Sequence, residues 1–261
     1  MWDTFRIVFL MGLAAGGLFI DPPVNQAFEG RQAESGGGAI ATGRGTIEGT
    51  VFYRNDAKHT WRYARFYVRS TRTGELAEAV VALNGPGLKG PGLTDAGSEH
   101  AGVKFTSRVT IIDQKEMRFV PETVAIRAGD RVRFTNSDPQ THNIALNDPR
   151  RQFSDTIGSG QKAVETFPRA SGIRRPFALA CSLHSQMQGW IYVFDHPYYQ
   201  VTGVDGRFRL ENIPPGDYRL DLAHSAGDLH ASRTIQVKAN QTLKIEIVLT
   251  PTSASPVLTP N

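Results

Sequence analysis

The chain has 261 residues, with 29 lysines and arginines against 25 aspartates and glutamates, and it contains one cysteine. This length is enough for one or two domains with a buried core, and a hydrophobic content of 40% indicates a globular protein. A single cysteine excludes an intramolecular disulfide framework and a cysteine-rich zinc module. The small positive excess is spread along the chain without a basic run, which argues against nucleic-acid binding.

Residues 1–27 predict a signal peptide or an N-terminal anchor. An apolar run extends from Ile7 to Ile20 and ends at Asp21-Pro22-Pro23. The run is short for a membrane span but has the length of the apolar region of a signal peptide. We therefore expect a periplasmic or secreted protein, with association with the cell envelope as a further possibility. A buried N-terminal strand or helix is the alternative.

Residues 28–44 carry little hydrophobic content and predict a linker. Beyond the linker, almost every apolar pattern has a period of two: Val132 and Phe134, for example, alternate with arginines. The same alternation is seen at 190–194, 218–222 and 243–249. Short alternating runs separated by Gly, Asn, Asp and Pro indicate half-buried strands of sandwiches or barrels. The predicted fold class is all-β.

Composition divides the remainder of the chain into blocks. A Gly- and Pro-rich connector at 85–103 separates a first β segment, 45–84, from a middle block, 104–196. A third block covers 197–250, and the Thr-, Ser- and Pro-rich residues 251–261 predict a loose tail.

The middle block contains four side chains that together suit a metal ion. Cys181, His184 and Met187 follow one another at steps of three, and His142 lies well upstream. A thiolate, two imidazoles and a thioether form the set that selects copper in a trigonal site with a weak axial Met. A short loop can turn three of these donors toward one point, while His142 must arrive from a distant strand. Such a rigid site suits one-electron transfer.

Other chemistries fit the same residues less well. A catalytic Cys/His pair is disfavoured because His184 lies on the same tight loop as Cys181 and is poorly placed as a base. Zinc is disfavoured because Met is a poor zinc ligand. A binuclear copper centre would need a second cysteine, and the His-x-His pairs of a multicopper oxidase are absent.

The sequence around these donors resembles a known family. Residues 119–136 read FVPETVAIRAGDRVRFTN, Thr141-His-Asn-Ile144 follows, and Gly189-Trp-Ile-Tyr-Val-Phe194 closes the block. With these motifs, residues about 108–194 resemble a cupredoxin, the blue-copper fold of plastocyanin and amicyanin. The resemblance implies a Greek-key β-sandwich with one type 1 copper. It assigns His142, Cys181 and His184 as strong ligands, Met187 as the long axial ligand, and Asn143 as the residue that connects the two ligand loops.

The ligand loop departs from those relatives at two positions. Leu183 stands where plastocyanin and amicyanin have Pro, and Ser185 follows the second histidine. The ligands are unaffected, but no partner-docking surface can be carried over from the relatives.

The third block resembles a second family. Asp205-Gly206 predicts a tight hairpin turn, and Pro214-Pro215-Gly216 predicts a rigid turn. The surrounding pattern, Thr-x-x-Asp-Gly-x-Phe-x-Leu-x-x-Ile-Pro-x-Gly-x-Tyr-x-Leu, resembles the carboxypeptidase regulatory-like domain, a transthyretin-like β-sandwich. Its opening strands are missing at 197–200. We hypothesise that 45–84 supplies them, so that the cupredoxin is inserted between two halves of one sandwich. Two tandem small domains are the alternative.

Together these features predict a type 1 copper protein that carries single electrons to a redox partner protein, with no catalysis and no substrate of its own. The combination resembles secreted bacterial proteins of the methylamine-utilisation or plastocyanin-like type. Copper storage or delivery is an alternative, and so is an extracellular binding module with a structural copper.

Several charged or titratable residues outside the ligand set also carry expectations. An arginine group is expected either to form a basic rim near the copper loop, for an acidic partner, or to be ordinary solvated surface; it comprises Arg150, Arg151, Arg169, Arg174 and Arg175. His224 and His230 are expected on surface loops, with a second metal site as the alternative. His196 is expected at the domain junction.

Overall fold

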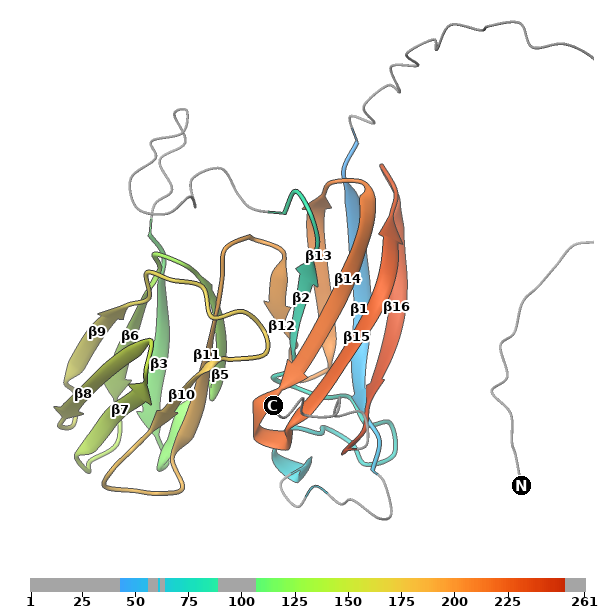
Figure 1. Cartoon of the computed structure of the whole chain (residues 1–261). Helices are drawn as coiled ribbons and strands as arrows, with labels where there is room; N and C mark the ends of the chain where they lie inside the picture. The colour runs from blue at the N-terminus through green and yellow to red at the C-terminus, as the bar shows by residue number, and fades with distance from the viewer. Residues whose placement is uncertain (1–42, 56–60, 62–63, 89–106, 252–261) are drawn as a thin grey trace, which may run out of the picture. The chain divides into compact units, whose positions relative to one another are not determined.

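The computed structural model describes residues 43–55, 61, 64–88 and 107–251 (Figure 1). The predicted signal peptide or anchor, 1–27, lies outside the described residues. So do nearly all of the predicted linker, residues 89–103 of the connector, and residues 252–261 of the tail. In the part of the chain that the structure describes, no helix is long and apolar enough to cross a membrane.

The all-β prediction is confirmed, because the described elements are strands apart from two short 3-10 helices. The strands of the middle block are β3 (Val109–Lys115), β4 (Arg118–Val120), β5 (Thr123–Arg127), β6 (Arg131–Asn136), β7 (His142–Asp148), β8 (Arg151–Ile157), β9 (Lys162–Thr166), β10 (Phe177–Ala180) and β11 (Gln188–Phe194). They form a five-stranded sheet, β5-β11-β10-β7-β8, and a four-stranded sheet, β4-β3-β6-β9. An apolar core that includes Phe119, Phe134, Ile144 and Phe167 is buried in this block, which we call the copper-side sandwich.

The flanking segments supply the remaining elements. These are β1 (Gly45–Tyr53), η1 (Ala64–Phe66), β2 (Val80–Asn84), β12 (Tyr199–Val201), β13 (Arg207–Ile213), β14 (Gly216–His224), η2 (Ser225–Gly227), β15 (Leu229–Val237) and β16 (Thr242–Leu249). They form a three-stranded sheet, β13-β1-β16, and a four-stranded sheet, β12-β2-β14-β15. A second core, with Ile47, Leu83, Leu220 and Leu249 among its members, belongs to this flanking sandwich.

Strands from the two flanking segments pair with each other in both sheets. β1 pairs with β13 in antiparallel and with β16 in parallel orientation, while β2 pairs with β12 and β14 in antiparallel orientation. The chain therefore leaves the flanking sandwich after β2 and returns to it at β12, and the nine strands of the copper-side sandwich lie between these points.

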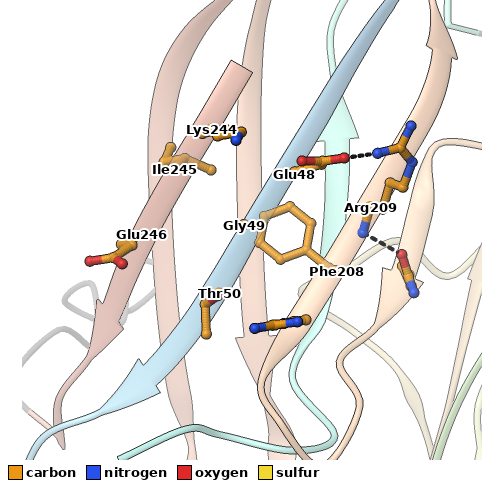
Figure 2. A pocket seen from close by; sticks show the side chains of 10 residues that line it. Glu48, Gly49, Thr50, Phe208, Arg209, Lys244, Ile245 and Glu246 are labelled. Atoms are coloured by element: carbon orange, nitrogen blue, oxygen red, sulfur yellow. Dashed lines mark hydrogen bonds and ion pairs between the residues drawn. The ribbon is translucent and has the colours of Figure 1, made fainter. Parts of the chain in front are cut away.

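The central strand of the three-stranded sheet needs a glycine (Figure 2). A Cβ atom at Gly49 would lie 2.6 Å from a ring carbon of Phe208 on β13 and 2.5 Å from the carbonyl oxygen of Ile245 on β16. Glu48, the preceding residue, forms an ion pair with Arg209 across β1 and β13. The Phe208 ring thus packs directly against the β1 backbone, an approach that any side chain at position 49 would prevent.

Strand β11 differs from the prediction of a half-buried strand, because both of its faces are buried. Ile191 and Val193 belong to the core of the copper-side sandwich. Tyr192 and Phe194 pack instead in a separate apolar cluster with Val80, Ala82 and Ala223 of the flanking sandwich. Alternation within one strand shows that its two faces differ, but a second packed layer can bury the face that would otherwise meet solvent.

Candidate metal centre

The strand pairing brings the predicted ligands together. His142 opens β7, whereas Cys181 and His184 lie in the loop between β10 and β11, which we call the ligand loop. β7 and β10 are antiparallel neighbours in which Ala145 pairs with Ala180. Because antiparallel strands place the start of one beside the end of the other, His142 meets the loop that follows β10.

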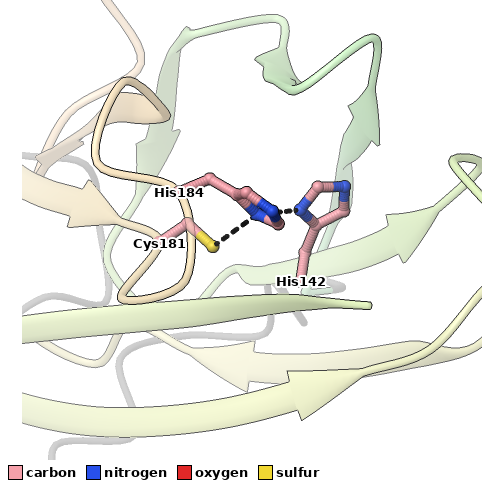
Figure 3. A group of neighbouring side chains, drawn as sticks. All are labelled: His142, Cys181 and His184. Carbon is pink, nitrogen blue, oxygen red and sulfur yellow. Dashed lines mark hydrogen bonds between the residues drawn. The ribbon is translucent and has the colours of Figure 1, made fainter. Parts of the chain in front are cut away.

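Three predicted ligands converge on one point (Figure 3). Nδ1 of His142 lies 3.0 Å from Nδ1 of His184, and Sγ of Cys181 lies 3.7 Å from the same His184 nitrogen. All three donor atoms are within 4.8 Å of one another. His142 is fully buried and Cys181 is 3% exposed, while His184 is partly exposed.

This donor set fits copper. Metal–nitrogen and metal–sulfur bonds of about 2.0 and 2.3 Å, as in zinc sites, would place ligand atoms about 3.5 to 4 Å apart around a trigonal ion. The observed spacings need only small adjustments to hold such an ion. Two imidazoles and one thiolate are the donors that copper takes in trigonal sites. Bound copper would supply one-electron redox chemistry, and the three side chains would hold it.

Met187 lies at the end of the ligand loop and is fully buried. Its backbone N–H donates to the carbonyl of His184 at 3.0 Å, and its carbonyl accepts from the N–H of Cys181 at 3.3 Å. These two hydrogen bonds close the loop on itself and fix the backbone on either side of His184. The role of Met187 as an axial ligand stays a prediction.

Asn143 connects the two chain segments that carry the ligands. Its backbone N–H donates to Sγ of Cys181 at 3.3 Å, and its side-chain oxygen accepts from the hydroxyl of Ser182 at 3.0 Å. Its side-chain nitrogen donates to Ser154 and to the carbonyl of Asp155 on the neighbouring strand β8. The Asn143 side chain therefore holds β7, β8 and the ligand loop in one arrangement, and its backbone braces the Cys181 sulfur.

Asp138 is part of the site and was not predicted. Its Oδ2 lies 2.9 Å from Nε2 of His142, so that Nδ1 of this histidine faces His184 and Cys181. Burial by itself would raise the pKa of Asp138, but hydrogen bonds from the Met117 and Glu116 amides and from His142 hold it below its ordinary value. A carboxylate behind a ligating histidine fixes the ring orientation. The sequence signal that could have indicated this role is the position of an aspartate four residues before the predicted ligand His142.

Three of the five arginines considered for a basic rim, Arg150, Arg151 and Arg175, lie far from the ligand loop. In the antiparallel register of β7 and β8, Arg151 lies opposite Asp148. This end of the hairpin is about 20 Å from His142, at 3.3 Å per residue. Arg150 forms an ion pair with Asp148 and donates to the carbonyl of Arg175, which precedes β10. The prediction of a basic rim at the copper loop is wrong for these three residues, because the ligands lie at the opposite strand ends.

The surface-loop prediction for His224 is wrong. His224 ends β14, is 1% exposed, and packs edge-on against Trp61 and Tyr67. Nε2 of His230 lies 3.5 Å from Oδ1 of Asp228. Among the described residues, the three predicted ligands are the one group with metal-binding spacing, so no second site is found at these histidines. His196 is buried and packs against Phe194 and Tyr199.

Comparison with known proteins supports a copper-binding domain. Residues 106–194 match the family model of copper binding proteins of the plastocyanin/azurin family. This match covers about a third of the chain, and it includes all nine strands of the copper-side sandwich and the three predicted ligands that converge. The copper-side sandwich is thus a copper-binding domain of the cupredoxin class. No curated protein matches the chain.

The solved structures that resemble the chain include copper proteins. Amicyanin from Paracoccus versutus is 22% identical, with 36% of this chain and 87% of that chain covered and a TM-score of 0.30. A reduced amicyanin mutant is 19% identical, with 33% and 82% covered and the same TM-score of 0.30. A copper-containing nitrite reductase from Thermus scotoductus is 20% identical, with 38% of this chain but 24% of that chain covered, again at a TM-score of 0.30.

Proposed function

We propose that the protein is a periplasmic or secreted one-electron carrier with a single type 1 copper and no catalytic activity of its own. His142, Cys181 and His184 hold the copper, and Met187 supplies the weak axial ligand. The observation that carries the proposal is the burial of preformed donors: Cys181 and His142 are 3% and 0% exposed. Donors held in place before the metal arrives suit a copper that changes its charge with little rearrangement.

Burial also favours electron transfer over copper storage or delivery. A delivery site must release its ion to an acceptor, which is easiest where the thiolate is exposed to an incoming ligand. Here the Cys181 sulfur lies inside the sandwich and accepts a backbone hydrogen bond from Asn143. The partly exposed His184 and its neighbour Leu183, which is 56% exposed, are open to a redox partner.

The flanking sandwich is, in this proposal, a carboxypeptidase regulatory-like domain that acts as a scaffold. The pairing of β1 with β13 and β16, and of β2 with β12 and β14, supports a single domain interrupted by the copper-side sandwich. Its role is to hold the electron carrier where a partner protein or the cell envelope can be reached.

The visible and EPR spectra of the full chain with Cu(II) test the proposal. We expect an intense thiolate-to-copper band and a narrow hyperfine splitting, both lost in Cys181→Ser. Ser185→Ala, a change at an exposed position of the same loop, should leave both signals in place. A colourless protein that binds Cu(I) tightly but Cu(II) weakly would replace the proposal with storage or delivery. An unchanged spectrum in Cys181→Ser would exclude the assigned thiolate.

A further inference from the structure

A cleft of about 550 Å³ lies against the ligand loop. Ser185, Gln186 and Gln188, which flank Met187 in the sequence, form part of its wall. Phe66 and Tyr67, from the segment around η1, form another part. The volume falls in the range of sites that bind small molecules, about 300 to 1,000 Å³.

The cleft carries no unpaired charge among its wall residues. Its one cation, Arg118, forms an ion pair with its one anion, Glu122, at 2.6 Å. A charged ligand would therefore find no opposite charge to compensate its lost hydration, and burial of an uncompensated ion is costly. The ligand that suits this wall is neutral.

The Glu122 carboxylate already binds one phenol. Its Oε2 accepts a short hydrogen bond from the hydroxyl of Tyr67, and its Oε1 accepts from Nε of Arg118 at 2.7 Å. Burial, and then the hydrogen bond and charge of Glu122, raise the pKa of Tyr67 well above its ordinary value, so this phenol stays protonated and donates. Because Oε1 also lies 2.6 Å from a second guanidinium nitrogen of Arg118, the acceptor position that remains for a ligand is on Oε2.

Flat apolar surfaces make up much of the remaining wall. Phe66 is 51% exposed, Trp190 is partly exposed, and the thioether of Met117 lies in the same wall. The Arg118 guanidinium stands 5.3 Å from the Phe66 ring centre, as in a cation–π contact. Aromatic rings stack on such surfaces, and thioethers and guanidinium groups also pack against them favourably.

We propose that this cleft binds a neutral aromatic ring that carries one or two hydroxyl groups. The ring packs against Phe66 and Trp190, and its hydroxyl bonds to Glu122 or to the side-chain amides of Gln186 and Gln188. A sugar is a poorer match, because its many hydroxyls would compete for a carboxylate whose two oxygens both have partners. The proposal concerns the protein without metal as well as with it, so it does not rest on the copper function.

Calorimetric titration of the metal-free full chain with 2-naphthol, a neutral two-ring phenol, tests the proposal. We expect saturable binding at one molecule per chain. Methyl β-glucoside and 2-naphthoate, a neutral polyol and an anion, should bind much more weakly. Phe66→Ala and Gln188→Ala change exposed cleft residues and should each weaken 2-naphthol binding by about fivefold to tenfold. Val164→Ala, an exposed position on β9 outside the cleft wall, is the matched control and should not change it.

The following results would each overturn the proposal. Absence of saturable 2-naphthol binding shows that the cleft is not a site for phenols. Equal binding by the natural chain and Phe66→Ala places the ligand elsewhere. Tighter binding of the glucoside replaces the aromatic ligand with a carbohydrate, and tighter binding of 2-naphthoate refutes the argument from charge pairing. Circular dichroism of each variant shows that a loss of binding is not a loss of fold.

Discussion

The buried histidine of the flanking sandwich predicts a strong dependence of stability on pH. His224 is 1% exposed, and its two ring nitrogens have no hydrogen-bond partner among the described residues. The rings of Trp61 and Tyr67 pack edge-on against it, with centroids 4.9 and 4.7 Å away. Burial lowers the pKa of His224 from 6.5 to about 4, because a protonated imidazole has lost its hydration there.

The size of the change in the free energy of unfolding follows from this pKa shift. Between pH 6.5 and about 4 the unfolded chain binds a proton at His224 that the folded chain does not. The contribution of neutral His224 to the free energy of unfolding is therefore fully present above pH 6.5 and is lost progressively as the pH falls toward 4. At about 1.36 kcal/mol per pKa unit, the loss amounts to about 3.4 kcal/mol. That is a large part of the stability of an ordinary domain, about 5 to 15 kcal/mol.

Urea unfolding at several pH values between 7.5 and 4 measures this loss. Carboxylates also titrate in this range, so the informative quantity is the difference between the natural chain and His224→Phe, which keeps an aromatic ring at the site. The variant should lose about 3 kcal/mol less stability over the same interval. His224→Leu serves as a second variant if the larger ring does not fit. His230→Gln, on the neighbouring strand β15, should behave like the natural chain. Identical pH dependence of the natural chain and both His224 variants would refute the reasoning.

Three further substitutions test the site and the sheet. Asp138→Ala removes the carboxylate behind His142, and we expect copper affinity to fall by about 10- to 100-fold in a chelator competition, with the fold intact by circular dichroism. Asn143→Ala removes the side-chain hydrogen bonds between β7, β8 and the ligand loop, and should lower the free energy of unfolding of the metal-free chain by about 2 kcal/mol in urea. Gly49→Ala places a methyl group against Phe208 and should destabilise the chain by about 1 to 3 kcal/mol in the same assay, whereas a neutral effect would show that the sheet opens easily.

Much of the metal centre was predictable because its information is local. Cys181, His184 and Met187 lie on one short loop, and their chemistry restricts the ion that they can bind. His142 followed from the need for a fourth donor and from the motif around it. Asp138 was missed because an acidic residue in a turn has many ordinary roles. Only the fold shows that its carboxylate reaches Nε2 of His142.

The wrong predictions share a cause, which is that they depend on contacts between distant segments. His224 stands in the polar sequence His-Ser-Ala-Gly-Asp and looked like a loop residue, but Trp61 and Tyr67 from a remote segment cover it. A basic rim at the copper loop also depends on the direction of β7 and β8, which the sequence does not specify. Strand direction places Arg151 beside Asp148 and His142 beside Ile157, at opposite ends of one hairpin.

Strand β11 explains how the insertion of one sandwich into another can serve the metal centre. The strand begins directly after Met187, so its position determines where the ligand loop ends. One face contributes Ile191 and Val193 to the copper-side core, and the other contributes Tyr192 and Phe194 to the cluster with Val80 and Ala82 of β2. The Tyr192 hydroxyl is also hydrogen-bonded to Ser225 at 2.5 Å. A strand packed on both faces has little freedom to shift, so the flanking sandwich helps to keep the ligand loop in one geometry. In the proposed electron carrier, restricting that movement would lower the structural change that accompanies each electron transferred.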